Sequence, residues 1–135
     1  MLKKIHHIAI AVKDLDKSLS LYTDLFGLKS RVLDMENYHL KIAFIEVGDV
    51  LIELLQPTQE DDPFGFDKFI KENGGGLHHI AYEVADVRKT IQILKENRIK
   101  MRNEEPVAGA DGLIAFAEKE STDGVLTEFV ERPKE

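Results

Sequence analysis

The sequence predicts an α+β fold built from two βαβββ modules in tandem, and an internal repeat is the main evidence. The segment I-H-H-I-A-I-A-V, which starts at Ile5, returns as L-H-H-I-A-Y-E-V from Leu77. The two copies are 72 residues apart, and the same register matches residues 42–44 to residues 114–116. A shift of 75 residues then matches V-L-I-E at 50–53 to V-L-T-E at 125–128. Alternating apolar residues in these segments favour strands.

The first module is expected to begin with a strand over residues 5–12. Large apolar side chains alternate there with a second face that carries small residues and His7. Asp14 is the expected N-cap of a helix that Gly27 ends. The predicted buried stripe of this helix is Leu15, Leu19, Tyr22 and Phe26. Residues 40–47 and 50–56 are predicted strands joined by a turn at 48–49, and residues 29–39 are expected to hold a strand and a loop.

The second module repeats this plan. A strand is predicted over 77–84, a helix begins after Asp86, and further strands are predicted over 113–118 and 124–131. Asp62 before Pro63 indicates the start of a helix, and residues 74–76 are three glycines that end it. We therefore expect one domain over residues 1–135, made of repeats at about 3–57 and 76–132 and a linker helix within 58–75.

Composition excludes several classes of protein. The chain has 135 residues, no cysteine and a net charge of −7, so disulfide frames and thiolate metal sites are ruled out. Its apolar runs are far shorter than the roughly 18 residues of a membrane span, and no signal peptide opens the chain. No Lys/Arg block is long enough to follow a nucleic-acid backbone. These features predict a cytoplasmic protein with no nucleic-acid or membrane partner.

The repeat also places a histidine and a glutamate at matching positions in each module. Glu53 and Glu128 lie within apolar strands, where an unpaired carboxylate is expensive to bury. Two copies of one unit can bring such side chains to a common axis. The sequence therefore predicts a cleft with one divalent-metal site, whose ligands are His7, Glu53, His79 and Glu128. Imidazole and carboxylate ligands suit Co, Zn, Ni or Mn. His6 and His78 point to the other face of their strands and are predicted not to be ligands.

These residues resemble the vicinal oxygen chelate superfamily, which includes glyoxalases, extradiol dioxygenases, fosfomycin-resistance proteins and epimerases of acyl-CoA thioesters. The resemblance covers about residues 3–132. Within the superfamily, the closest resemblance is to methylmalonyl-CoA epimerases. It is carried by segments at 5–15, 52–57, 62–70, 74–84, 106–112 and 123–129.

The resemblance implies a glyoxalase-like fold and a metal-dependent isomerase. It implies that the metal chelates the thioester and carboxylate oxygens of methylmalonyl-CoA and stabilises the enolate formed at C2. Glu128 and Glu53 are the implied catalytic bases, and Glu53 substitutes for a glutamate that this family carries on the strand at 40–47. A homodimer is also implied. Coenzyme A is anionic, so some of Lys41, Lys100, Arg102 and Lys119 are expected to line the mouth of the cleft.

Two alternatives remain open from the sequence. A lactoylglutathione lyase (glyoxalase I) of the same superfamily has a similar His/Glu/His/Glu set, although S-T-D-G-V-L at 121–126 favours the epimerase. A non-catalytic protein of this fold that binds small molecules or antibiotics is the second alternative. Two further features carry no assigned chemistry. His39 is expected in a loop, and the glycine-containing segment 105–112 suits either a pocket-lining loop or a hairpin connection.

Overall fold

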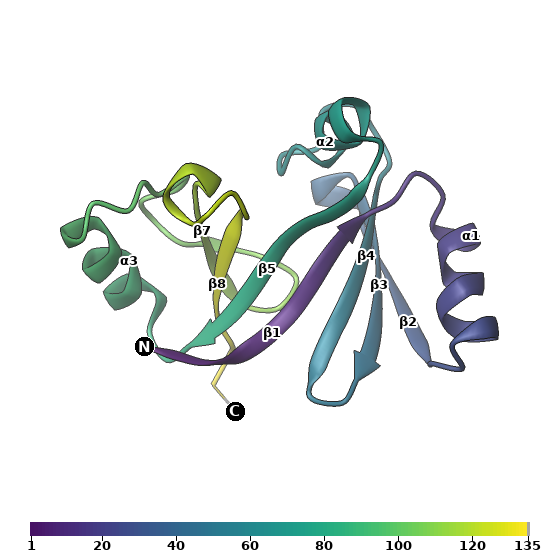
Figure 1. Cartoon of the computed structure of the whole chain (residues 1–135), viewed down its shortest axis with the longest axis horizontal. Helices are drawn as coiled ribbons and strands as arrows, with labels where there is room; N and C mark the ends of the chain where they lie inside the picture. Colours follow the sequence, from purple (N-terminus) through teal and green to yellow (C-terminus); the bar gives the residue numbers. More distant parts are fainter. Residues whose placement is uncertain (135) are drawn as a thin grey trace. The chain divides into compact units, whose positions relative to one another are not determined.

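The computed structural model describes residues 1–134 and has an α+β architecture (Figure 1). Each module follows the predicted βαβββ order, and a separate helix lies between them along the chain. No helix within residues 1–134 is long and apolar enough to cross a membrane. The elements are β1 (Leu2–Ala11), α1 (Leu15–Leu19), β2 (Ser30–Met35), β3 (Leu40–Val47), β4 (Val50–Pro57), α2 (Phe66–Asn73), β5 (Gly76–Val84), α3 (Val87–Glu96), β6 (Val107–Ala108), β7 (Leu113–Ala117) and β8 (Thr127–Glu131).

The chain divides into two compact units. The N-terminal unit is His7–His78, and the C-terminal unit comprises Met1–His6 and the chain from His79 onward. The strand order is β2-β3-β4-β1 in the first unit and β5-β8-β7-β6 in the second. In both, the last strand of the βαβββ module returns beside the first strand, so that β1 pairs with β4 and β5 pairs with β8 in parallel. All other strand pairs within each unit are antiparallel.

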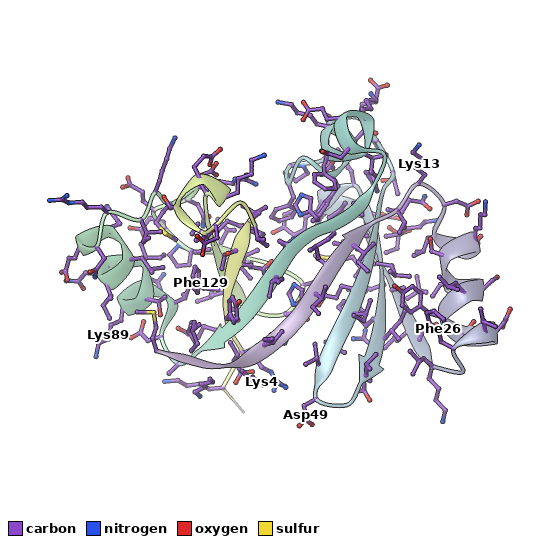
Figure 2. The ribbon with its side chains drawn as sticks, viewed as in Figure 1. Lys4, Lys13, Phe26, Asp49, Lys89 and Phe129 are labelled. Carbon is purple, nitrogen blue, oxygen red and sulfur yellow. The ribbon has the colours of Figure 1, made fainter. Side chains whose placement is uncertain are left out.

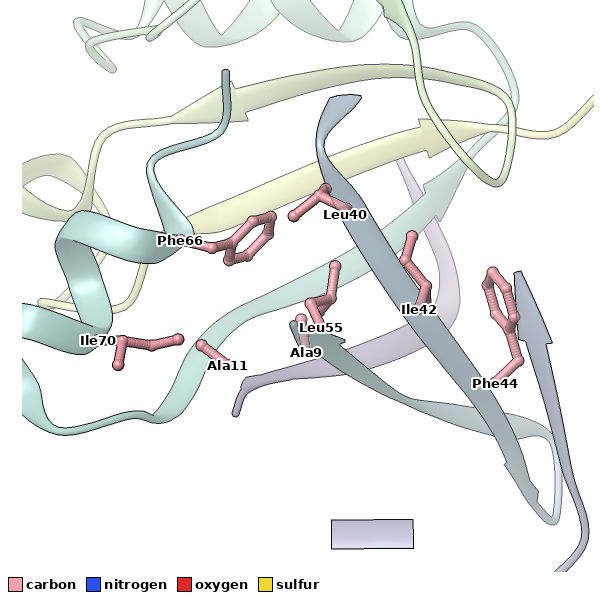
Figure 3. Packing of buried hydrophobic residues seen from close by; sticks show 8 residues of the cluster. All are labelled: Ala9, Ala11, Leu40, Ile42, Phe44, Leu55, Phe66 and Ile70. Atoms are coloured by element: carbon pink, nitrogen blue, oxygen red, sulfur yellow. The ribbon is translucent and has the colours of Figure 1, made fainter. Parts of the chain in front are cut away.

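The sheet of the N-terminal unit buries apolar side chains on both faces. On one face, Leu15 of α1 packs with Ala43, Ile45 and Leu54. The opposite face carries a cluster to which α2 contributes Phe66 and Ile70 (Figure 3). The strands contribute Ala9, Ala11, Leu40, Ile42, Phe44 and Leu55 to that cluster. Alternation along β1, β3 and β4 therefore assigns each side chain to either the α1 face or the α2 face.

The C-terminal unit has the equivalent arrangement around α3. Val87 and Ile91 of α3 pack against one face of its sheet, with Phe129 of β8 (labelled in Figure 2) in the same cluster. Ala115 and Ala117 of β7 belong to this cluster too. Small side chains on β7 let the helix approach the sheet closely.

The helices α1 and α3 begin in the same way, at the two predicted caps. The Asp14 side chain accepts a hydrogen bond from the backbone N–H of Lys17, and Asp86 accepts one from Lys89. A second acceptor comes from the last strand of each module. Gln56 Oε1 lies 2.8 Å from the backbone nitrogen of Leu15. Glu131 Oε1 lies 2.9 Å from the backbone nitrogen of Val87. Gln56 and Glu131 are 75 positions apart, so the second register of the repeat also describes these caps.

Some predicted boundaries are wrong in detail. The first helix becomes π-helical over Ser20–Leu25, and Phe26 is 54% exposed instead of buried. Each turn of a π-helix contains extra residues, so the 3.6-residue stripe moves off the sheet before it reaches Phe26. The last strand begins at Thr127 instead of residue 124, because Asp123 and Gly124 have positive φ angles of a turn.

Segment 105–112 is a hairpin connection. It contains the short strand β6, which pairs with β7, and the backbone N–H of Gly109 donates to the carbonyl oxygen of Gly112. Gly112 has a φ of 143°, and a Cβ atom there would lie 2.2 Å from the carbonyl oxygen of Glu131. Only glycine fits at position 112. Backbone geometry therefore accounts for this glycine, and no role in lining a ligand pocket is needed to explain it.

Asp62 fixes the start of α2. Its carboxylate is 6% exposed and accepts hydrogen bonds from the backbone N–H groups of Phe66 and Asp67, at 2.8 and 2.9 Å. The helix thereby gains a buried anionic acceptor at its N-terminus, which also interacts favourably with the helix dipole.

We predict that Asp62→Ala lowers the free energy of unfolding by about 1–2 kcal/mol, because two backbone donors lose their acceptor. Urea unfolding followed by circular dichroism measures this change. Asp61→Ala is the matched control, since the Asp61 side chain is 76% exposed and its polar contact, with His39 Nδ1 at 3.1 Å, is at the surface. We expect a change below about 0.5 kcal/mol. Equal losses in the two variants would contradict the capping role of Asp62.

Candidate functional site

A histidine and a glutamate are paired on adjacent parallel strands of the N-terminal unit. His7 Nδ1 lies 3.2 Å from Glu53 Oε2. Both residues are buried, with exposures of 1% and 2%. His7 alternates with Ala9 and Ala11 along β1, so the pair lies on the α2 face of this sheet. An ionised carboxylate at this depth requires a charged or hydrogen-bonding partner, and the His7 ring lies within ion-pair distance of it.

The C-terminal unit contains the equivalent pair. His79 Nε2 lies 2.9 Å from Glu128 Oε1, and the two residues are 2% and 4% exposed. The His79 ring also meets the Phe116 ring edge to face, at 5.2 Å between centroids. The Glu128 contact and the Phe116 ring together restrict the orientation of the imidazole.

The two pairs have the same strand register, which is the strongest structural sign of a common site type. In the first unit Glu53 is opposite Ala9, two residues after His7, and in the second Glu128 is opposite Ala81, two residues after His79. A phenylalanine on the next strand is opposite each glutamate, Phe44 opposite Glu53 and Phe116 opposite Glu128. The sequence repeat thus corresponds to the same arrangement of histidine, glutamate and phenylalanine in the two units.

Each pair offers one imidazole and one carboxylate as ligands. Imidazole and carboxylate donors suit ions such as Co, Zn, Ni or Mn better than a soft, thiolate-preferring ion. The four residues predicted as metal ligands therefore occur as two buried pairs, His7 with Glu53 and His79 with Glu128. A carboxylate within reach of a carbon acid can also act as a general base.

The other histidines are in different environments. His78 is 8% exposed, and its ring packs against Phe66 and Phe69 of α2 at centroid distances of 4.3 and 4.8 Å. His6 is also 8% exposed. His39 lies in the loop before β3, as expected, with a φ of 54°, and its Nδ1 is 3.1 Å from Asp61. The aromatic contacts of His78 provide a packing role that requires no metal.

Of the four cations among which some were expected at the mouth of the cleft, Lys41 lies on the other face of its sheet from the His7–Glu53 pair. Lys41 alternates with Ile42 on β3, and it lies with Lys13, Asp34 and Gln56 around a surface depression of about 630 Å³ beside α1. This is the α1 face, whereas the His7–Glu53 pair lies on the α2 face. Strand alternation puts the two groups on opposite sides of one sheet.

Ile42, the residue next to Lys41, lies on the strand where the resemblance implies a catalytic glutamate. Ile42 lies on the same face as the His7–Glu53 pair and is buried in the apolar cluster of Figure 3. No carboxylate occupies this central position of β3. Glu53 shares this face and lies on the neighbouring strand, opposite Phe44.

Sequence reasoning missed one cation on the α2 face. Arg31 of β2 is opposite Phe44 of β3, and its guanidinium carbon lies 4.4 Å from the centre of the Phe44 ring. Arg102, one of the four cations named from the sequence, stacks similarly at 5.9 Å from the Phe116 ring. The Arg102 Nε also pairs with Glu118 Oε1 at 2.5 Å. Arg31 and Arg102 are 71 positions apart, which matches neither register of the repeat, so the sequence carried no signal for Arg31.

Comparisons with known proteins agree with these observations. A mouse mitochondrial methylmalonyl-CoA epimerase is 33% identical over 131 residues, which cover 95% of this chain and 72% of that protein. An ethylmalonyl-CoA/methylmalonyl-CoA epimerase from Cereibacter sphaeroides is 33% identical over 133 residues, covering 96% of this chain and 98% of that protein. Among solved structures, a Streptomyces coelicolor methylmalonyl-CoA epimerase variant in complex with 2-nitronate-propionyl-CoA matches with a TM-score of 0.90. That protein is 30% identical, and the match covers 99% of this chain and 100% of that chain.

The family model also matches most of the sequence. It covers residues 6–116 and describes the Glyoxalase/Bleomycin resistance protein/Dioxygenase superfamily. The match spans β1 to β7, and therefore includes His7, Glu53 and His79. From this match, the identities above and the βαβββ architecture, the chain belongs to the Glyoxalase/Bleomycin resistance protein/Dioxygenase superfamily.

Proposed function

We propose that this protein is a metal-dependent methylmalonyl-CoA epimerase, which removes the proton at C2 of its substrate and returns it to the opposite face. The observation that carries the proposal is the buried His–Glu pair that recurs at the same strand register in each unit. The relatives with this architecture are named as epimerases of malonyl-type CoA thioesters, which supports this substrate class.

We propose further that the two pairs together bind one divalent cation through His7, Glu53, His79 and Glu128. Each pair is nearly inaccessible to water and contributes one neutral donor and one anionic donor. Two carboxylates balance the charge of a divalent cation, and imidazole tolerates each of the ions Co, Zn, Ni and Mn. When bound, the cation would supply positive charge for the substrate oxygens that gain electron density as the C2 proton leaves.

Proton transfer is assigned to the glutamates. A proton next to a thioester carbonyl needs a carboxylate in hydrogen-bond reach, and inversion at C2 needs a proton donor on each face of the carbon. Glu128 is proposed as one base. Glu53 is proposed as the other, because Ile42 fills the central position of β3 with an apolar side chain. The apolar surroundings, which include Phe44 and Phe116 opposite the two glutamates, exclude bulk water from the enolate, so that one glutamate keeps the proton it removes and the other delivers a proton to the opposite face.

Two further expectations stay predictions. The homodimer was implied by the family resemblance, and the cytoplasmic location was inferred from composition. The main alternative in the same superfamily is a lactoylglutathione lyase, which also moves a proton next to a carbonyl. The names of the similar proteins support the epimerase over the lyase.

The substrate class is tested by assaying both reactions with protein reconstituted with Co, Zn, Ni or Mn. We expect deuterium from heavy water to enter C2 of methylmalonyl-CoA, with conversion of one epimer into the other, followed by NMR and a chiral coupled assay. The hemithioacetal of methylglyoxal and glutathione should not be consumed. Turnover of the hemithioacetal without exchange at C2 would assign the protein to the lyases, and binding without either reaction would favour the non-catalytic class.

The metal ligands are tested by His79→Ala, with His78→Ala as the matched control. We expect His79→Ala to abolish metal retention and epimerisation while the protein stays folded, because an essential imidazole donor is lost. His78→Ala should lower the unfolding temperature, since its ring packs against Phe66 and Phe69. It should still bind metal at the wild-type ratio. Elemental analysis of the folded fraction measures both, and equal metal contents would contradict the ligand assignment.

The roles of the two glutamates are tested by Glu53→Gln and Glu128→Gln at saturating metal. Each change should lower epimerisation by about 10²–10⁴-fold, because one of two proton transfers loses its base. Each variant should nevertheless exchange the C2 proton of one epimer, the one that the remaining glutamate serves. Exchange of pure epimers in heavy water is the measurement, with metal content determined in parallel. Loss of exchange from both epimers in either metal-loaded variant would contradict the two-base assignment.

A further inference from the structure

Arg31 lies in a row of three residues that crosses three neighbouring strands of the N-terminal unit. It is opposite Phe44, and Phe44 is opposite Glu53. Residues that are opposite one another share a face of the sheet, so Arg31 is on the same face as the His7–Glu53 pair. Neighbouring strands lie about 4.8 Å apart, which places the backbone of Arg31 about 10 Å from that of Glu53.

The Phe44 ring holds the arginine side chain in this position. The guanidinium carbon is 4.4 Å from the ring centre, within the range of a cation–π contact. Phe44 itself is 6% exposed and belongs to the apolar cluster of Figure 3. A charged group stacked on a rigid ring loses less conformational freedom when it binds a ligand than a free side chain does.

No carboxylate of the described residues neutralises the charge of Arg31. Within residues 1–134, the guanidinium group has the Phe44 ring as its contact and forms no ion pair with a carboxylate. The equivalent row in the C-terminal unit is different: Arg102 stacks near Phe116, which is opposite Glu128, but Glu118 pairs with its Nε. Of the two equivalent arginines, Arg31 is therefore the one whose charge no carboxylate of residues 1–134 balances.

We propose that Arg31 binds an oxyanion of the thioester substrate, a carboxylate or a phosphate. This inference rests on the proposed function and extends it to substrate recognition. Guanidinium offers planar, paired donors that match either oxyanion. In a chain with a net charge of −7, a local cation beside the site is needed to attract an anionic thioester. Arg31 touches no reacting atom, so its contribution is to binding.

The test compares Arg31→Gln and Arg31→Lys with Lys41→Gln. The control removes the same charge from the neighbouring strand on the opposite face of the sheet. For methylmalonyl-CoA we expect Arg31→Gln to raise KM about tenfold with kcat changed less than about twofold, since a contact made equally in ground and transition states affects KM alone. Arg31→Lys should restore part of the affinity, and Lys41→Gln should match the wild type.

A truncated substrate identifies the oxyanion. Methylmalonyl-pantetheine keeps the carboxylate and lacks the phosphates of coenzyme A. If Arg31→Gln raises KM for the full thioester alone, the bound group is a phosphate, and if it raises both, the group is the carboxylate. A KM for Arg31→Gln within about twofold of the Lys41→Gln value on both substrates would overturn the proposal.

Calorimetric titration separates this proposal from the proposed function. Metal-loaded proteins are titrated with methylmalonyl-CoA, and we expect Arg31→Gln to bind about tenfold more weakly than Lys41→Gln. Wild-type protein that binds the thioester but does not epimerise it would contradict the proposed function alone. The binding ratio of the two variants would then still decide the role of Arg31. Absence of any binding by the wild type would contradict both.

Discussion

The burial of one imidazole beside one carboxylate, on neighbouring parallel strands, is the constraint on which the rest of each unit depends. A parallel pair needs a long connection, and here the helix and the two antiparallel strands of the βαβββ module supply it. The last strand thereby returns beside the first. His7 can reach Glu53 only in the register that sets Glu53 opposite Ala9. Ala9 leaves room for both side chains, as Ala81 does in the other unit.

The last strand of each module also caps the N-terminus of the helix on the opposite face of the sheet. Gln56 follows Glu53 on β4 and caps α1, and Glu131 follows Glu128 on β8 and caps α3. One strand therefore supplies a candidate ligand to one face and a helix cap to the other. A slip of one residue would move Glu53 to the face covered by α1 and Glu128 to the face covered by α3, and would bury an unpaired charge there. This coupling makes the register of the ligand strand unusually well determined.

Much of this arrangement could be predicted from the sequence, because it depends on alternation and repetition. The strands with strict alternation, the caps at Asp14 and Asp86, and the faces of His7 and Glu53 follow from those patterns. The exposed position of Phe26 could not be predicted, since the pitch of the helix changes within a continuous apolar stripe. Arg31 was missed for a different reason. β2 is an edge strand whose sequence, S-R-V-L-D-M, mixes polar and apolar residues on both faces, and only pairing with β3 assigns Arg31 to a face.

Under the proposed function, two like units serve one substrate whose two ends differ, so recognition requires the units to diverge. The buried positions have not diverged: each unit keeps its histidine, its glutamate and the phenylalanine opposite. The difference lies one strand further out, where Glu118 neutralises Arg102 and no carboxylate pairs with Arg31 within the described chain. A change of charge at an exposed edge costs little stability, whereas a change within a buried His–Glu pair costs several kcal/mol, about 3–5 when one partner is removed. The duplicated core can thus keep its chemistry while residues at its edges acquire selectivity for one end of the substrate.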